Sequence, residues 1–343
     1  MYRIHQLLQA VKGIIQQVQM ENRGRSKKCQ RGRPISKEAL EHMVLIKLLA
    51  TLMGWNVSQT HRLLTDPKIP IFRQMCGIPK SKIPPRRTLS YRWHNKKVMQ
   101  LQQRVFKRLL RELINSRSVK VMLIDMSDLP VSVKDQLARY GYCSKGGFWG
   151  YKFYLVTTAN GIPVAVVVSR ANEVEPSASE SLLNKVERIL RDDEIEAIAY
   201  FVGDAAFDCE AIYDDVERLF DGQLVCAVNP RRDEELKELR ERGELPQEKE
   251  QHLREMEDES NRAKGILIYA SEEGKRLYGR RIFLEQTIDL LKVDLRMGEI
   301  PYWVRGVRKV LRWVLDHVFL FVSIAYCNKL HRRPLRQVAP YLV

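Results

Sequence analysis

The sequence predicts an α/β protein in which a mixed β-sheet is flanked by helices and an all-helical, basic module precedes the sheet. Three observations lead to this fold class. Apolar residues recur at helical spacing up to Lys120 and then follow strand-like patterns. After that point the predicted strands and helices alternate, which is typical of layered α/β domains. The net charge of +16 is also distributed unevenly along the chain.

The composition is that of a globular protein. With 343 residues, of which 45% are hydrophobic and 29% charged, the chain is long enough for about two domains with a buried core. Its six cysteines form no CxxC pair, which argues against a zinc cage or a disulfide framework. The N-terminal residues do not resemble a signal peptide, and the apolar run 318–327 is too short to cross a bilayer. We therefore expect a cytoplasmic protein without a membrane partner.

The charge is divided by region. Residues 1–120 hold 26 Lys and Arg against 5 Asp and Glu, whereas residues 121–300 hold 24 against 36. Residues 301–343 are basic again, with 8 against 1. Basic segments of this size indicate a polyanionic partner, either nucleic acid or anionic lipid. The acidic middle either concentrates carboxylates for chemistry or carries a solvated charged helix.

The first 35 residues predict a short amphipathic helix over 4–19 and a basic linker over 21–34. Within the linker, Arg31 and Arg33 belong to an Arg-Gly-Arg-Pro sequence that resembles the core of an AT-hook. In such a core the extended arginines insert into a narrow minor groove of DNA. A solvated basic linker would have the same composition.

Residues 36–117 predict a DNA-binding domain of short helices. Ser36 is a candidate N-cap, and helices separated by tight turns are predicted over 37–53, 56–64, 71–76 and 88–115. This arrangement in so basic a segment suits a helix-turn-helix module, and Arg86, Arg87 and Arg92 are its candidate DNA contacts. A generic helical domain with a basic face is the alternative.

Residues 118–300 predict the sheet and its covering helices, and 301–343 a basic C-terminal helical segment. Strands are predicted over 119–126, 148–159, 162–169, 197–203, 223–229 and 265–270, and helices over 177–190, 207–220, a charged insert at 231–262, and 279–297. Asn160-Gly161 is a strong hairpin turn between the second and third strands. The mixture of hairpin and crossover connections predicts a mixed sheet.

Two aspartates, Asp125 and Asp204, end separate central strands of this predicted sheet. Functional sites gather where such strands pass into loops. A buried strand also tolerates an ionised carboxylate poorly unless a metal or partner compensates its charge. Either residue alone could be a turn or helix-cap residue, but the pair in this topology favours a site.

The last predicted helix carries four polar residues on one face. Tyr278, Arg281, Glu285 and Lys292 fall within a stripe about 60° wide at 100° per residue. An exposed salt-bridge ladder is the alternative, because Arg281 and Glu285 are four residues apart. Asp289 borders the same stripe and is the rival third carboxylate.

The spacing of this stripe, Y-(2)-R-(3)-E-(6)-K, resembles the signature of DDE transposases from prokaryotic insertion sequences. The segment LIDMSDLPV resembles the family's first-aspartate block, and FVGDAAFDCEAIY its second. Between them, GYKFYLVTTANGIPVAVVVS resembles the intervening hairpin. The resemblance covers about residues 36–330.

The resemblance implies a ribonuclease H-like catalytic core and a transposase activity. Asp125, Asp204 and Glu285 would then bind two Mg²⁺ ions, with Mn²⁺ as a substitute, for cleavage and transfer of DNA strands. Tyr278, Arg281 and Lys292 would hold the element end. The partners would be double-stranded DNA, namely the terminal inverted repeats and the target, with a homodimer in the DNA-bound complex. The enzyme would act in the cytoplasm, on chromosomal DNA.

Other functions remain open at this stage. A nuclease of the same fold would cut DNA without joining it, and a DNA-binding regulator would use only the basic helical domain. A relative that has lost catalysis would keep the fold alone. The neighbouring carboxylates Asp128, Asp208 and Asp289 are expected to matter far less for cleavage than the three candidate ligands.

Overall fold

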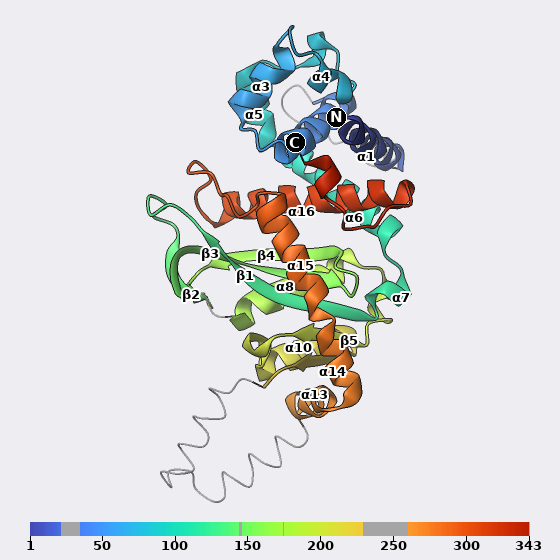
Figure 1. Ribbon diagram of the computed structural model, residues 1–343, viewed down its shortest axis with the longest axis vertical. Helices are drawn as coiled ribbons and strands as arrows, with labels where there is room; N and C mark the ends of the chain where they lie inside the picture. Colours follow the sequence, from blue (N-terminus) through green and yellow to red (C-terminus); the bar gives the residue numbers. More distant parts are fainter. Residues whose placement is uncertain (22–34, 144–145, 174, 229–259, 343) are drawn as a thin grey trace, which may run out of the picture. The chain divides into compact units, whose positions relative to one another are not determined.

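The computed structural model describes residues 1–21, 35–143, 146–173, 175–228 and 260–342 (Figure 1). The chain forms two compact units. Unit 1 consists of Met1–Leu113, Asp289–Glu299 and Arg312–Val343. Unit 2 consists of Ile114–Ile288 and Ile300–Leu311. The C-terminal segment, which the sequence suggested as a separate element, thus belongs largely with the N-terminal helices.

Unit 1 is helical in the residues described. Its elements are α1 (Tyr2–Glu21), α2 (Lys37–Leu52), α3 (Val57–Thr65), α4 (Ile71–Met75), η1 (Lys80–Lys82), α5 (Arg86–Trp93), α6 (Lys96–Leu113), the π-helical turn η3 (Leu290–Asp294), most of α16 (Val307–Leu330) and η4 (Ala339–Tyr341). Ser36 caps α2 as predicted, since its side chain accepts a hydrogen bond from the Ala39 amide. Asn56 caps α3 in the same way through the Gln59 amide.

The apolar helix α16 forms part of the core of unit 1. By length and composition it could cross a membrane, but 67% of its most apolar window is buried inside the protein. Its Asp316 forms a 2.9 Å ion pair with Lys47 of α2 and accepts a 2.8 Å hydrogen bond from Gln102 of α6. Lys47 and Gln102 are themselves joined at 3.0 Å. These contacts link three helices of the unit through one buried polar network.

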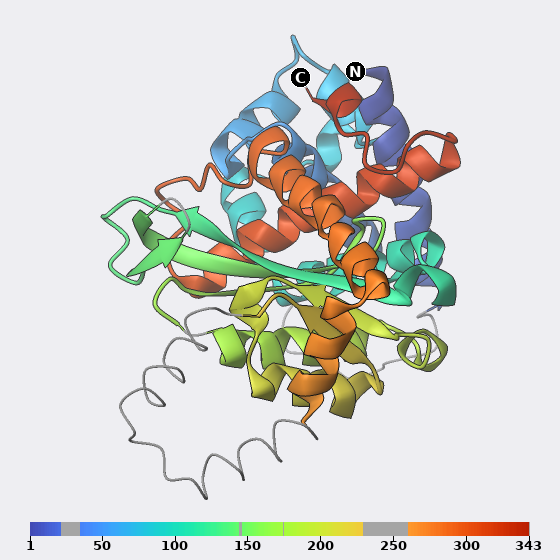
Figure 2. The same cartoon turned by 60° about the horizontal axis from the view of Figure 1, so that its bottom comes forward.

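Unit 2 is built on a six-stranded mixed sheet (Figures 1 and 2). Its strands are β1 (Val121–Pro130), β2 (Arg139–Cys143), β3 (Gly146–Thr158), β4 (Pro163–Arg170), β5 (Tyr200–Gly203) and β6 (Gln223–Cys226). Strands β1, β5 and β6 pair in parallel, while β3 pairs antiparallel with β1, β2 and β4. The turn at Asn160-Gly161 joins β3 to β4 as predicted, with Gly161 at a φ of 75°.

Helices flank this sheet, as the sequence predicted. They are α7 (Ser116–Val119), α8 (Glu175–Ile189), α9 (Asp192–Ile195), η2 (Ala205–Phe207), α10 (Glu210–Phe220), α13 (Asn261–Ala270), α14 (Glu272–Gly279) and α15 (Arg281–Asp289). Helices α8 and α10 pack against each other beside the sheet (Figure 2). The core between the layers is rich in fully buried aromatic residues, among them Tyr154, Phe201 and Phe207. The arrangement is consistent with a ribonuclease H-like core.

Two of the predicted helices are broken. The helix predicted over 88–115 is divided into α5 and α6, because the Asn95 side chain accepts a hydrogen bond from the Lys97 amide and starts a new helix there. The helix predicted over 279–297 is divided into α15 and η3, and α14 ends just before it at Gly279. Tyr278, Arg281, Glu285 and Lys292 therefore do not lie on one continuous helix, and the angles predicted at 100° per residue do not hold across all four.

One predicted strand is wrong, and one strand was not predicted. Residues 265–270 belong to the helix α13, which Ser260 caps through the Ala263 amide. Gly265 allows this helix close to β6, since a Cβ there would lie 2.3 Å from the Leu224 carbonyl oxygen. The short edge strand β2 carries a weak apolar pattern and depends on pairing with β3. Residues 231–259, which make up most of the predicted insert, lie outside the described residues.

Candidate active site

The pairing of β1 and β5 sets Asp125 and Asp204 level with each other. Leu123 of β1 pairs with Val202 of β5 in parallel register, and each aspartate follows two residues later. Neighbouring parallel strands lie about 4.8 Å apart, and residues two positions along a strand point to the same face. The sheet therefore directs both carboxyl groups to one place.

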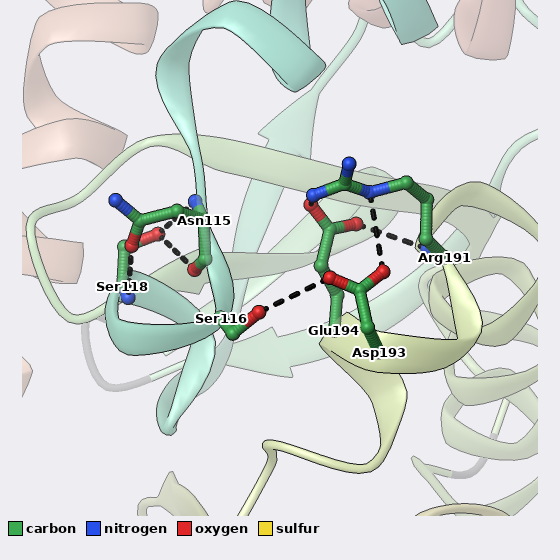
Figure 3. A network of polar contacts seen from close by, with 6 residues as sticks. All are labelled: Asn115, Ser116, Ser118, Arg191, Asp193 and Glu194. Carbon is green, nitrogen blue, oxygen red and sulfur yellow. Dashed lines mark hydrogen bonds and ion pairs between the residues drawn. The ribbon is translucent and has the colours of Figure 1, made fainter.

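A polar network at the opposite end of these strands holds their register (Figure 3). Helix α7 leads into β1 and α9 leads toward β5. Ser116 of α7 donates a 3.2 Å hydrogen bond to Asp193 of α9. The Lys120 carbonyl oxygen also accepts hydrogen bonds from the amides of Ala199 and Tyr200. The two helices and the strands that follow them are thus fastened together before the strands reach the aspartates.

Asp125 is a buried carboxyl group with unusual electrostatics. Its Oδ1 accepts a 2.7 Å hydrogen bond from the Met126 amide. Burial, followed by the negative charge of Asp204, raises the pKa of Asp125 to about 7, although Arg281 acts in the opposite direction. Glu285 adds a smaller effect that also raises this pKa. The other two candidate carboxylates therefore act electrostatically on Asp125, and Arg281 offsets their effect only in part.

Asp204 lies where β5 ends. Its Oδ1 accepts a 3.0 Å hydrogen bond from the Ala206 amide, so it caps η2. The capping role that the sequence left open is therefore present, and it leaves the second carboxylate oxygen for another partner. The preceding Gly203 is closely surrounded, since a Cβ there would lie 3.2 Å from Ile124 and Phe207.

Arg281 connects the third carboxylate to this group. Its Nη2 lies 3.4 Å from Asp125 Oδ2 and 3.6 Å from Glu285 Oε1. Its Nη1 donates a 2.8 Å hydrogen bond to the Tyr278 hydroxyl group, and the guanidinium also stacks 5.1 Å from that ring. The Arg281 side chain is only 14% exposed. An exposed salt-bridge ladder does not describe this arrangement.

Helix α15 is held on the sheet by its other face. Thr287 donates a 2.9 Å hydrogen bond to the Gly161 carbonyl oxygen in the β3–β4 turn. Leu284 and Ile288 are buried beside it. Glu285, one residue from Leu284, is left with a side chain 53% exposed. The helix therefore presents a solvent-accessible carboxylate next to the buried Asp125.

The donor set suits a hard divalent cation in its chemistry. Mg²⁺ and Mn²⁺ prefer carboxylate oxygens, and Asp125, Asp204 and Glu285 provide them from three elements. Among the residues described, no group of three acidic, histidine or cysteine side chains stands ready to hold a metal. Instead, the guanidinium of Arg281 lies between Asp125 and Glu285. The pKa of Asp125 stays raised, chiefly through burial, so this arginine does not compensate the charge of that carboxylate fully.

Sequence reasoning missed the pair Asp208 and Arg262. Asp208, which was expected to matter little for cleavage, has a fully buried side chain. It accepts hydrogen bonds from Arg262 Nε at 2.7 Å and Nη2 at 2.8 Å. This pair ties the loop after β5 to α13. Asp208 lies four residues after Asp204, but the pattern of the sequence gave no sign of its partner.

The remaining candidates lie elsewhere. Lys292 is in the turn η3 of unit 1, where its carbonyl oxygen accepts a hydrogen bond from the Gly298 amide. Arg31 and Arg33 lie outside the described residues. Arg86 and Arg87 are exposed at the start of α5 and line a hollow of about 630 Å³ with Ser90 and Tyr91. Arg92, on the same helix, is half-buried.

A family model for the transposase DDE domain matches residues 117–313, which is more than half of the chain. The chain belongs to the transposase DDE domain family. The matched span contains all three candidate carboxylates. None of the curated proteins compared with the chain matches it. The protein is thus a transposase by family, and DNA is the substrate of this class of enzyme.

Proposed function

We propose that the protein is an insertion-sequence transposase that binds the terminal inverted repeats of its element, cuts the DNA there and joins the free end to a target. The observation that carries this proposal is that Asp125 and Asp204 follow equivalent register positions of neighbouring parallel strands. Arg281 connects Glu285 to Asp125. A regulator that only binds DNA would need no such group of carboxylates.

In the proposed reaction, water attacks a phosphodiester at the element end. The new P–O bond replaces the bond to the 3′ oxygen, which leaves as a 3′-hydroxyl group. That hydroxyl then attacks a target phosphodiester and displaces its 3′ oxygen. Asp125, Asp204 and Glu285 would hold two Mg²⁺ or Mn²⁺ ions, which lower the pKa of the attacking hydroxyl group and stabilise the leaving oxygen. The carboxylates need not form a covalent intermediate with DNA.

Arg281, Tyr278 and Lys292 are proposed to hold the DNA end. The guanidinium of Arg281 can present a fork of donors to a phosphate. Its buried Nε has no hydrogen-bond partner in the part of the chain described, so the guanidinium is not fully paired within the protein. Tyr278, already in contact with Arg281, is supported by an edge-to-face contact with Tyr269 of α13. Lys292 would add a flexible positive charge.

The helices of residues 36–117 are proposed to recognise the terminal repeats as a helix-turn-helix domain. Helices α3 and α4 pack together, and α5 packs on α3. Arg86 and Arg87 at the exposed start of α5 would contact phosphates, with Arg92 behind them. Arg31 and Arg33 would add minor-groove contacts. Because two element ends must be brought together, we propose a homodimer on DNA.

Incubation with Mg²⁺ and DNA ending in the terminal repeats tests the activity. The repeats can be found by sequencing the DNA that flanks the gene. Cleavage followed by joining to a target supports the proposal. Cleavage without joining would indicate a nuclease of the same fold, and binding without cleavage a regulator.

The recognition domain is tested separately by measuring DNA affinity against salt concentration. Each phosphate contact that is lost lowers the magnitude of the salt slope by about 1. The double variant Arg86→Ala/Arg87→Ala should therefore bind more weakly and with a shallower slope. Lys275→Ala is the control, since Lys275 is an exposed cation paired with Glu272 on α14. Equal slopes in the two variants would remove α5 from the DNA contact.

A further inference from the structure

Unit 2 exposes four aromatic side chains in two segments far apart in the sequence. Tyr140 and Tyr142 lie on β2 and are 53% and 71% exposed. Tyr302 and Trp303, in the loop before α16, are 67% and 46% exposed. Within each pair the rings meet edge to face, 5.4 Å apart in β2 and 5.0 Å apart in the loop. Tyr and Trp are enriched where one end of the ring system is apolar and the other meets water, so two exposed pairs of rings are a candidate binding feature.

A buried carboxylate fastens the two segments together. Asp135, only 2% exposed, precedes β2 and accepts a 2.8 Å hydrogen bond from the Tyr151 hydroxyl group. The same oxygen accepts a 3.1 Å hydrogen bond from the Gly306 amide, in the loop that carries Tyr302 and Trp303. Leu137 packs against Gly306, where a Cβ would lie 2.8 Å from its side chain. The segments that carry the two aromatic pairs are therefore fastened to each other.

The two segments that carry the aromatic pairs are basic where they are exposed. Among the described residues of 131–149 and 300–311, the acidic side chain is Asp135, and it is buried in the contacts given above. The exposed charged residues of the same segments are all basic: Lys134, Arg139, Arg305, Arg308 and Lys309. Arg305 is oriented by a 2.8 Å hydrogen bond from its Nε to the Tyr302 carbonyl oxygen. Cations interleaved with exposed aromatic rings match the phosphates and base faces of nucleic acid.

The two segments are connected to the strand that carries Asp125 through β3. From Asp125, β1 continues for five residues to Pro130, which pairs with Gly150 of β3, and Gly150 pairs in turn with Arg139 of β2. At roughly 3.4 Å per residue, Pro130 lies about 17 Å from Asp125 along the strand, and Arg139 lies two strand spacings of about 4.8 Å further across the sheet. That distance is a few nucleotides from a phosphate held at Asp125.

We propose that Tyr140, Tyr142, Tyr302 and Trp303, with the cations around them, form a binding surface for unpaired bases of DNA adjacent to the cleavage site. An exposed ring can stack only on a base whose face is free, and in a duplex these faces are covered by neighbouring base pairs. The cations hold the backbone of the same strand. The inference rests on the proposed function for the choice of DNA as partner, and it adds a preference for DNA that is locally unpaired.

The test is a binding measurement with the full-length protein in EDTA, so that cleavage plays no part. One DNA is a plain duplex, and the other is the same duplex with a short unpaired tail that contains 2-aminopurine. The wild-type protein should bind the tailed DNA more tightly and quench the 2-aminopurine fluorescence on stacking. Tyr302→Ala/Trp303→Ala should lose the quenching and weaken tailed binding by about fivefold to a hundredfold, with little change for the duplex.

Two further variants serve as controls. Trp303→Phe keeps an aromatic face and should retain the preference for the tail. Leu267→Ala removes an exposed apolar side chain of α13, 71% exposed, and should behave as the wild-type protein. Equal affinity of the wild-type protein for the two DNAs, or quenching that survives in the double alanine variant, would overturn the inference. Tail binding in a protein that fails to cleave would instead count against the proposed activity alone.

Discussion

Unit 2 contains two arginine–carboxylate pairs that differ in how fully the arginine and the carboxylate are hydrogen-bonded to each other. We call the fully bonded pair, Asp208 and Arg262, the closed pair, and the partly bonded one, Asp125 and Arg281, the open pair. Arg262 donates two hydrogen bonds of 2.7 and 2.8 Å to Asp208, whose side chain is fully buried. Arg281 reaches Asp125 with one contact of 3.4 Å and is shared with Glu285 and Tyr278. Burial and the neighbouring Asp204 raise the pKa of Asp125 to about 7. The first pair satisfies its partners, and the second does not.

This difference separates a structural ion pair from a site. A closed, buried pair has no capacity for another charged group, so Asp208 and Arg262 can only hold the loop after β5 against α13. An open pair retains both an undercompensated carboxylate and an unsatisfied guanidinium donor. Strongly shifted pKa values of this kind are typical of functional sites.

The largest expected effect is the loss of DNA cleavage when one of the three candidate carboxylates is removed. Asp125→Ala, Asp204→Ala and Glu285→Ala should each reduce cleavage of element ends roughly a thousandfold or more, since bound metal contributes several kcal/mol of transition-state stabilisation. Binding to DNA ends should change little. Cleavage assays and thermal denaturation of each variant provide the measurement.

Asp289→Ala is the matched control for these variants. Asp289 is an exposed carboxylate on the same helix as Glu285. Near-normal cleavage is expected for it, and retained cleavage in one of the three alanine variants would exclude that residue from the site. Asp208, which the sequence suggested as a second control, is unsuitable because its loss leaves Arg262 without its bidentate partner in the buried pair.

The closed pair should govern stability instead. Asp208→Ala leaves a buried guanidinium without its counter-charge and should lower the free energy of unfolding by about 3–5 kcal/mol. The double variant Asp208→Leu/Arg262→Met removes both charges and should recover most of this loss. Urea denaturation of the wild-type protein and both variants measures the difference. A double variant no more stable than Asp208→Ala would show that the pair does more than neutralise charge.

The comparison also explains what the sequence could reveal. Strand ends with an isolated carboxylate are local patterns, so Asp125 and Asp204 could be found and their strands placed. The Arg262–Asp208 pair joins residues 54 positions apart, and no local period records such a contact. The same limit made residues 265–270 a predicted strand, because a short apolar run cannot distinguish a buried strand from a packed helix.

The stripe Tyr278, Arg281, Glu285 and Lys292 shows a mixed result. Its first three members do meet through Arg281, although the chain breaks between α14 and α15 instead of continuing as one helix. The π-helical turn that contains Lys292 depends on local packing that spacing alone does not encode. The role of Lys292 in holding DNA stays a prediction.

Substitution of Arg281 tests whether the open pair acts on DNA. Arg281→Lys keeps the charge but not the fork of donors, so strand transfer should fall by about a hundredfold. Lys292→Ala should also impair transfer, with a melting temperature within a few degrees of wild type. Transfer assays and thermal denaturation would decide this. Normal strand transfer in both variants would show that Arg281 and Lys292 have only a structural role.

The smallest expected effect is a pH dependence of stability in metal-free protein. The pKa of Asp125 is about 7 in the folded protein against an ordinary value of 3.8, so the folded state binds the proton more tightly than the unfolded state does. The contribution of Asp125 to stability is therefore largest below pH 4 and is lost as the pH rises toward 7. Asp125→Asn is neutral at every pH and keeps an oxygen for the Met126 amide.

In EDTA, Asp125→Asn should therefore melt above the wild-type protein at pH 8, and the difference should shrink as the pH is lowered to 4. Mg²⁺ should reduce the difference at pH 8, because a bound cation compensates the ionised carboxylate in the wild-type protein but has lost a ligand in the variant. Glu285→Gln is the control, since its exposed side chain leaves its charge largely screened by solvent. The prediction is contradicted if the variant melts below the wild-type protein at pH 8 without metal. The ion pair with Arg281 would then outweigh the cost of burying the charge of Asp125, as expected for the pair Asp208 and Arg262.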